Sequence, residues 1–396
     1  MNTKDAAVAR EAKAMTRREI VMRAAGGLIS WETAALILRL SERHMRRIRD
    51  KYEQFGVEAL EDRRSGRPRA RRVPLKTVAE VCRLKRDVYE DFSMKHFHEV
   101  VTEKHKLSLS YTLLRYVLQD AGLVEKAPGR GKYRRKRERR PMVGMLIHMD
   151  ASTHEWIPGL PMQDLVVVLD DADGRILFAR FVEQEGTRST LEALYAVLRR
   201  FGRFCEFYTD RGSHFCRTPK AGGASETDGQ VSRALRTLGI RQILARSPQA
   251  RGRSERAFGT IQGRLPQELR VEGITNYADA NKYLERVFVR DFNKRFTVVP
   301  TESGSAFVAL AGIDLDLVLS EKYERVVGKD CVVSFENLEL QLPEPKDRAS
   351  HARCAVTVHR LVDGTLAVAW NGRELARFSA AGDLLREPRR RRDRAA

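Results

Sequence analysis

The sequence DLVVVLDDADGRILFARFVEQ, residues 164–184, contains two runs of apolar residues separated by Asp171-Ala172-Asp173-Gly174. Short apolar runs bounded by turn-forming residues are typical of buried strands. An Asp-Gly step between two such runs favours a tight hairpin turn. The stretch therefore predicts two antiparallel strands joined by a hairpin.

Segments on both sides extend this hairpin into a sheet. VGMLIHMD, residues 143–150, predicts a strand before it. After it we expect, in order, a helix at 187–202, strand EFYTD at 206–210, a helix near 231–238, strand RQILA at 241–245 and a long helix from about Arg253. The order βββαβαβα predicts a central α/β domain at residues 141–312.

Residues 1–62 predict a helix-turn-helix domain. Apolar residues recur at helical spacing from Thr16 to about Tyr52, with breaks at Gly26-Gly27 and before Ser41, which can cap a third helix. A helix-turn-helix places such a helix in the DNA major groove. The arginines of this helix are therefore candidate DNA contacts, and a solvated basic face is the alternative: Arg43, Arg46, Arg47 and Arg49.

Residues 75–128 predict a second helix-turn-helix domain, because YTLLRYVLQDAG, residues 111–122, carries an apolar stripe at helical spacing. Three nearby histidines suggest zinc, but Cys82 stands alone and no cysteine pair completes a set of four ligands. The histidines are His96, His98 and His105.

Basic linkers are predicted on both sides of this second domain, at residues 63–74 and 129–140. In the first linker Arg64, Arg67 and Arg69 are candidate DNA contacts, since an arginine beside a proline can lie in a minor groove. A purely flexible linker is the alternative. The second linker, GRGKYRRKRERR, carries too much like charge for a packed core and is predicted to grip phosphates.

Residues 320–380 predict a small all-β barrel, since short alternating segments are broken there by glycine and proline. Residues 386–396 form a basic tail. The sequence does not decide whether the β module contacts DNA, another subunit or both.

The charge is concentrated at the two ends of the chain. The formal net charge is +20 and the pI is about 10.0, with +16 in residues 1–140, +4 in residues 386–396 and none in the remainder. A polyanion, above all double-stranded DNA, is the predicted partner, and an anionic membrane surface is the alternative.

Five scattered cysteines without a CxxC pair do not suggest a disulfide framework. No apolar run approaches the roughly 20 residues of a membrane span, so we expect no membrane contact. The sequence predicts a cytoplasmic protein associated with the nucleoid.

Three acidic residues occupy positions from which they can converge. Asp150 ends the strand LIHMD, Asp210 ends the strand EFYTD, and Glu255 lies in the first turn of the last helix. Any one of them alone is more readily explained as a turn former or a helix cap. Together they offer the hard oxygen ligands that two-metal phosphoryl transfer needs. Just before Glu255, three side chains are candidate phosphate contacts: Gln249, Arg251 and Arg253.

HMDAS (148–152), YTDRGSHF (208–215) and SPQARGRSERAFGTIQGRL (247–265) resemble the three acidic motifs of the retroviral-integrase superfamily. With its helix-turn-helix regions and β module, the chain resembles bacterial insertion-sequence transposases of the ISNCY group over most of residues 16–380. The resemblance implies a multidomain fold: all-α helix-turn-helix modules, a central α/β RNase H-like integrase catalytic core and a small all-β barrel.

The resemblance also implies a DDE-type polynucleotidyl transferase. Asp150, Asp210 and Glu255 would bind two Mg²⁺ ions, with Mn²⁺ as a substitute. The enzyme would bind the terminal inverted repeats of an insertion sequence as a homo-oligomer on DNA and catalyse strand cleavage and strand transfer. Asn293 and Pro300 match the segment that follows the catalytic helix.

One departure from the family pattern is the spacing of 45 positions between Asp210 and Glu255, longer than in retroviral integrases. The excess falls in the glycine-rich residues 219–229. Two alternatives remain: a DNA-binding transcriptional regulator with an inactive integrase-like domain, and a nuclease of the same fold that does not join strands. The intact acids argue against the first.

Overall fold

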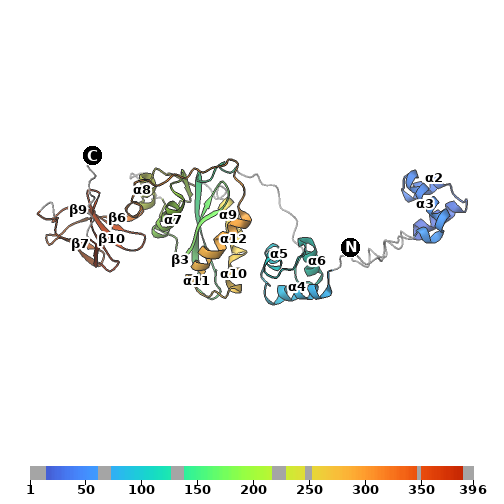
Figure 1. The fold of residues 1–396 in the computed structure, drawn as a ribbon, viewed down its shortest axis with the longest axis horizontal. Helices are drawn as coiled ribbons and strands as arrows, with labels where there is room; N and C mark the ends of the chain where they lie inside the picture. Colours follow the sequence, from blue (N-terminus) through green and yellow to red (C-terminus); the bar gives the residue numbers. More distant parts are fainter. Residues whose placement is uncertain are drawn as a thin grey trace. The chain divides into compact units, whose positions relative to one another are not determined.

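A computed structural model describes residues 15–60, 73–125, 138–215, 229–245, 252–345 and 349–386 (Figure 1). The chain forms two compact units, residues 1–78 and 79–396. The predicted fold classes are confirmed: helical N-terminal regions, a central α/β domain and a C-terminal all-β module. None of the described helices is long and apolar enough to cross a membrane.

The first unit contains the predicted helix-turn-helix. Residues 15–25 are helical and are followed by α2 (Trp31–Leu38), α3 (Glu42–Phe55) and the short helix η1 (Val57–Leu60). The Ser41 hydroxyl accepts a hydrogen bond from the N–H of His44, so Ser41 caps α3 as predicted. Met45 and Ile48 of α3 are buried against Val21 and the alanines of α2.

The second helical region comprises α4 (Leu75–Asp87), α5 (Met94–Glu103) and α6 (Tyr111–Asp120) around a core that includes Phe97 and Leu114. A buried lysine closes the turn between α4 and α5. The Lys85 ammonium donates to the carbonyls of Tyr89, Glu90 and Phe92 at 2.9, 2.7 and 2.8 Å. These bonds satisfy a cation whose pKa burial lowers. They fix the backbone that leads into α5.

The central sheet has the order β3-β2-β1-β4-β5, with β1 antiparallel to β2 and parallel to β4. Its strands are β1 (Leu146–His154), β2 (Gln163–Asp170), β3 (Ile176–Val182), β4 (Glu206–Thr209) and β5 (Arg241–Leu244). With the helices between them, they follow the predicted order βββαβαβα. The predicted hairpin also forms, since Gly174 N–H donates to the Asp170 carbonyl at 2.9 Å.

Helices cover both faces of this sheet (Figure 1). One face buries Ile147 and Met149 of β1 under α7 (Thr187–Phe201) and α8 (Gln230–Thr237). The other face buries Leu165 and Val167 of β2. It is covered by α9 (Gly252–Gln262), α10 (Leu265–Val271), α11 (Tyr277–Tyr283), the π-helix η3 (Leu284–Phe288) and α12 (Val289–Phe296). The second face is called the α9 face below.

Two asparagine side chains protect the edge strand β3. The Asn281 amide accepts from Phe181 N–H at 2.7 Å and donates to the Phe181 carbonyl at 3.1 Å. Asn293 makes the same pair of bonds with Ile176, at 2.7 and 2.8 Å. Side-chain amides thus take the place of a neighbouring strand on an edge that would otherwise invite pairing.

Two sequence predictions about the catalytic motifs are wrong in detail. Strand β1 does not end at Asp150 but continues to His154, because it pairs with β2 as far as Gln163. The predicted long helix from Arg253 ends at Gln262, and α10 starts at Leu265. Pro266 explains this break, since its ring would clash with the carbonyl of Gln262 in a continuous helix.

The C-terminal module is an antiparallel sheet with the order β12-β11-β10-β9-β6 and a hairpin, β7–β8, that shares its core. Arg233 of α8 joins it to the α/β domain, donating to the carbonyls of Val318 and Ser320 at 3.1 and 2.6 Å. The elements are α13 (Leu315–Val318), β6 (Glu321–Val326), β7 (Val332–Phe335), β8 (Leu338–Gln341), β9 (Ala355–Arg360), β10 (Leu366–Trp370), β11 (Arg373–Phe378) and β12 (Leu384–Arg386).

Candidate active site

Asp150 lies in β1, and Asp210 directly follows β4, the parallel neighbour of β1. His148 of β1 is in register with Tyr208 of β4, so two residues further along Asp150 is level with Asp210. Neighbouring strands are about 4.8 Å apart, and side chains two residues apart share a face. Both carboxylates therefore lie on the face that carries His148 and Tyr208, whose rings are 5.0 Å apart. Asp150 is also paired with Val167, which places it on the α9 face.

Glu255 projects from α9, the helix that runs along this face of β1. At the far end of α9 the Gln262 amide donates to the Ser152 hydroxyl at 2.8 Å. Glu255 and Gln262 are seven residues apart, so they share one side of the helix. Seven residues of helix span about 10 Å, or roughly three residues of strand. Glu255 is therefore brought to the level of residues 149–150 of β1.

The start of α9 is fixed by a buried acid, Asp171. This carboxylate accepts from His148 Nε2 at 2.7 Å, from Arg253 at 2.6 Å and from the Arg140 N–H at 2.8 Å. Burial alone would raise the pKa of Asp171, but the bonds from His148 and Arg140 and the charges of His148 and Arg253 hold it at about 2. Asp171 thus ties Arg253 of α9 to His148 of β1. These two residues lie two positions before Glu255 and Asp150, respectively.

Asp170, Asp171 and Asp173 lie at the hairpin turn after β2, and all three are buried. The Asp170 carboxylate accepts from the N–H groups of Gly144 and Ala172, while burial raises its pKa to about 6. The only sequence signal for buried anchoring carboxylates is the presence of three acids in four residues at the end of an apolar strand. Nothing local distinguishes it from an ordinary acidic turn.

The loop after Asp210 is compact because Gly212 has no side chain. The Asp210 carboxylate accepts from Gly212 N–H at 2.8 Å. A Cβ on Gly212 would lie 2.8 Å from the His214 ring and 3.0 Å from an Asp210 carboxylate oxygen. His214 is mostly buried, with its Nε2 3.5 Å from a Glu185 oxygen. The imidazole therefore lies beside the Asp210 loop and faces a carboxylate from the turn between β3 and α7.

Two further polar side chains near the site have structural roles. Trp156 is fully buried and donates to the Gln163 carbonyl at 3.0 Å. His148 shares the face of Asp150 and is bonded to Asp171.

The donor set at Asp150, Asp210 and Glu255 fits a divalent cation of the magnesium type. All three are carboxylates, the ligands that such hard cations prefer, and none is fully buried. The described part of the chain, which includes all three of these acids, nevertheless contains no group of three or more histidine, cysteine, aspartate or glutamate side chains close enough together to enclose a metal ion. His96, His98 and His105 bond separately to Glu268, to the Leu109 carbonyl and to the Tyr89 hydroxyl.

The candidate DNA contacts divide into three groups. On α3, Arg43, Arg46 and Arg47 are exposed, whereas Arg49 is half-buried and lies near Asp50 and Glu53 on its own helix. Arg253 contacts Asp171 instead of solvent. The remaining candidates lie outside the described residues, as do most of the two linkers and the basic tail: Arg64, Arg67, Arg69, Gln249 and Arg251.

The described end of the second linker is built into the fold. Arg139 donates to the Asp171 carbonyl at 3.0 Å, and Arg140 pairs with Glu206 of β4 at 2.6 Å. These last residues of the basic stretch therefore contact protein acids and carbonyls at the start of the catalytic domain.

A family model described as a helix-turn-helix domain matches residues 16–69. Over 372 residues the chain is 32% identical to a protein of Sinorhizobium fredii that carries the name transposase y4bF, covering 93% of this chain and 81% of that protein. It is 28% identical over 360 residues to the transposase for insertion sequence IS1202 of Streptococcus pneumoniae, covering 81% of this chain and 77% of that one.

Solved structures of retroviral integrases are also similar. One is the intasome of simian T-cell lymphotropic virus with the PP2A regulatory subunit B56 gamma, at 12% identity and a TM-score of 0.33, covering 78% of this chain and 100% of that chain. Another is the HTLV-2 integrase catalytic core domain with magnesium, at 15% identity and a TM-score of 0.28, covering 38% of this chain and 92% of that chain.

The relative, matched over 81% of its length, agrees with the helix-turn-helix match, and the mixed sheet is consistent with both. The chain belongs to the transposases, DNA-binding enzymes of DNA transposition.

Proposed function

We propose that the chain binds the terminal inverted repeats of an insertion sequence and catalyses metal-dependent cleavage and transfer of their strands. Asp150, Asp210 and Glu255 carry the reaction. The observation that supports this most directly is the strand register, which makes Asp150 level with Asp210 on the face that α9 covers. Glu255 comes to the same level because Gln262 and Arg253 anchor α9 at both ends.

The three carboxylates would hold two Mg²⁺ ions, for which Mn²⁺ can substitute. Bound there, the ions would activate water or a DNA 3′-hydroxyl and stabilise the leaving oxygen. The protein's own contribution is positional. Asp171 and Ser152 fix α9 against β1, and Gly212 keeps bulk away from the Asp210 carboxylate.

The helical regions supply DNA binding in this proposal. The exposed arginines of α3 would contact the major groove, and residues 1–62 and 75–128 would each act as a helix-turn-helix domain. Residues 141–312 would form the catalytic core, with the β module at 320–380 attached through Arg233. Because an element has two ends, we propose a homo-oligomer that pairs them.

A strand-transfer assay tests the proposal. Labelled inverted-repeat ends, a target plasmid and Mg²⁺ are incubated with the full chain, with Asp150→Asn and with the control Asp279→Asn, an exposed acid on α11. We expect joined products from the wild type and the control. Asp150→Asn should bind the ends and cut nothing.

Each alternative predicts a different result in the same assay. Nicks without joined products would indicate a nuclease that does not join strands. End binding with no Mg²⁺-dependent cleavage by the wild type would indicate a regulator. Undiminished cleavage by Asp150→Asn would remove the carboxylate triad from the mechanism.

A further inference from the structure

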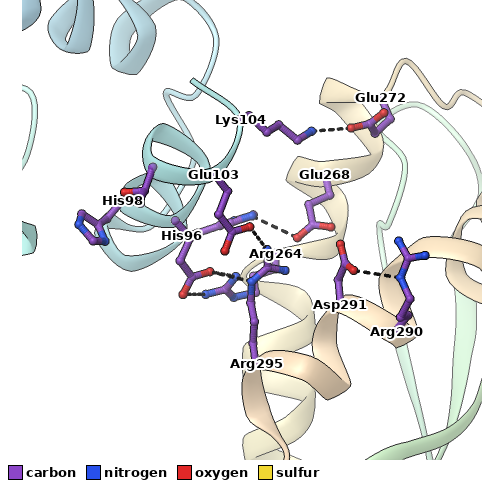
Figure 2. Close-up of polar contacts among 12 residues, drawn as sticks. His96, His98, Glu103, Lys104, Arg264, Glu268, Glu272, Arg290, Asp291 and Arg295 are labelled. Carbon is purple, nitrogen blue, oxygen red and sulfur yellow. Dashed lines mark hydrogen bonds and ion pairs between the residues drawn. The ribbon is translucent and has the colours of Figure 1, made fainter. Parts of the chain in front are cut away.

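The second helical region is attached to the catalytic domain by polar pairs in which each acid on one side faces a basic group on the other (Figure 2). The pairs come from α5 and the turns on either side of it, and their partners come from α10, its N-terminal corner and α12. They are Asp91–Arg270 at 2.6 Å, His96–Glu268 at 3.1 Å, Glu99–Arg264 at 2.7 Å, Lys104–Glu272 at 2.7 Å and Glu103–Arg295.

The centre of this interface is buried. Arg264 is only 6% exposed, binds Glu99 through two nitrogens at 2.7 and 3.2 Å, and lies over the Phe296 ring at 4.9 Å. Arginine and carboxylate in this two-pronged geometry form a strong and directional pair. The outer pairs, such as Asp91–Arg270, are about half exposed and contribute little. The Glu99–Arg264 pair therefore carries the specificity of the attachment.

Apolar and hydroxyl contacts support the same centre. His96 is stacked on Phe92, with ring centroids 4.1 Å apart, while its Nε2 faces Glu268. The other oxygen of Glu268 accepts from the Tyr283 hydroxyl at 2.9 Å. Val271 of α10 packs against the core of α4, α5 and α6. The interface is thus continuous with the cores on both sides.

Arg264 occupies the corner between α9 and α10. Its own N–H donates to the Ile261 carbonyl at 3.0 Å, and Gln262, two residues earlier, is bonded to Ser152 of β1. Glu255 lies on the Gln262 side of α9, two turns back. Glu99 therefore holds the end of the helix that carries Glu255 from one side, while β1 holds it from the other.

We propose that Glu99 and Arg264 are positioning residues for the active site. Seating the second helical region on the α9–α10 corner fixes the position of Glu255 along β1, from which it would bind metal together with Asp150. This inference rests on the proposed function, because it takes Glu255 to be a metal ligand. Helix α6 lies outside these pairs and keeps Thr112, Arg115 and Tyr116 exposed for DNA. A DNA end held by α6 is thereby coupled to the carboxylates.

The test compares Glu99→Gln, Arg264→Gln and the double variant with a matched control, Asp91→Asn, which removes an exposed pair of the same interface. Two quantities are measured on the full chain: Mn²⁺ affinity by calorimetry, and the Mg²⁺ concentration that gives half-maximal cleavage of labelled ends. A residue that orients a metal ligand typically changes metal affinity or activity by about 10- to 100-fold.

We expect each central single variant to weaken Mn²⁺ binding and raise the Mg²⁺ requirement by at least about 10-fold. The double variant should lose less than the sum of the two single losses, because Glu99 and Arg264 share their main bond, although Glu99 also faces Arg295 at 3.6 Å. All of these variants should bind DNA ends as the wild type does. The control Asp91→Asn should also keep the wild-type melting temperature. It should change the Mn²⁺ affinity and the Mg²⁺ requirement by less than about 2-fold.

Wild-type Mn²⁺ affinity and Mg²⁺ requirement in Glu99→Gln would overturn the inference. So would additive losses in the double variant, or a loss confined to end binding. If the wild type binds Mn²⁺ in a Glu99-dependent way but never cuts DNA, the positioning role stands and the proposed reaction fails. If the wild type binds no Mn²⁺, both are overturned.

Discussion

Replacing Asp171 by Asn should destabilise the catalytic domain while leaving its hydrophobic core unchanged. The substitution is nearly isosteric but removes the charge that His148 and Arg253 face at 2.7 and 2.6 Å. Asp171 is 1% exposed, so water cannot replace the lost carboxylate. The Arg253 guanidinium, itself largely buried, would keep its charge without an anion beside it.

The magnitude follows from two independent arguments. The pKa of Asp171 lies at about 2 instead of its ordinary 3.8, which corresponds to about 2.5 kcal/mol favouring the charged form. Removing one partner of a buried ion pair costs about 3–5 kcal/mol. We therefore expect the free energy of unfolding to fall by about 2.5–5 kcal/mol at pH 7.

The sign of the pH dependence is also fixed. A carboxyl group whose pKa is lowered by folding stabilises the native state above its unfolded pKa, and this stabilisation is lost as the pH falls toward the folded value. The difference between wild type and Asp171→Asn should therefore be full above about pH 5 and shrink between pH 4 and pH 2.

The chain carries its own reporter for this measurement. Its three tryptophans fall one in each part: Trp31 in the first helix-turn-helix, Trp156 in the catalytic domain and Trp370 in the β module. With Trp31→Phe and Trp370→Phe as background, urea unfolding followed by fluorescence reports on the environment of Trp156 alone. Asp279→Asn serves as the exposed control, for which only a small shift is expected, because its bonds to Lys282 and Asn276 lie at the surface. A midpoint for Asp171→Asn equal to that of the control would refute the buried-anchor argument.

Three further predictions concern other parts of the chain. Gly212→Ala should reduce cleavage while end binding is kept, because its Cβ would lie within 3.0 Å of Asp210 and His214; equal cleavage rates in a single-turnover assay would contradict this. Asn293→Ala should lower the urea-unfolding free energy reported by Trp156 by about 2 kcal/mol, since both polar groups of Ile176 lose their partner. Asn293→Asp keeps only the hydrogen-bond acceptor, so its free energy of unfolding should lie between those of the wild type and Asn293→Ala. In the β module, burial and the charges of Lys322 and Arg233 lower the pKa of His359 to about 4. The free energy of unfolding, followed by the fluorescence of Trp370, should fall by about 3 kcal/mol between pH 6.5 and pH 4. The reason is that His359 takes up its proton at a higher pH in the unfolded state than in the folded state. His359→Gln should flatten that slope.

The sheet could be predicted because its signals are local. The apolar runs of β1 to β5 and the Asp-Gly turn before β3 each lie within a few residues of sequence, so periodicity and turn chemistry identify them. The position of Asp210 directly after β4 follows from the same runs, whereas Asp150 lies within β1 and not at its end. The end of α9 was missed although its cause, Pro266, is also local, since the helical apolar pattern continues through it.

The polar network could not be predicted because its members are far apart in sequence. Asp171 meets Arg253 across 82 positions, and Glu99 meets Arg264 across 165. The sequence around each of these residues is that of an ordinary charged surface residue. Only the distant partner allows the charged side chain to be buried. The same holds for His96, which suggested a metal and instead faces Glu268.

These long-range contacts are concentrated on α9, and this distribution bears on how the site is assembled. Phe258 and Ile261 fix which side of α9 faces the sheet, but hydrophobic contacts are not directional and leave the helix free to slide along β1. Its axial position is set by directional bonds to Asp171 at its start, Ser152 at its end and Glu99 just beyond. A shift of one residue moves Glu255 by about 1.5 Å, which is large compared with the tolerance of a metal–oxygen bond. The polar anchors therefore set the geometry of the carboxylates, while the apolar core sets only the fold that carries them.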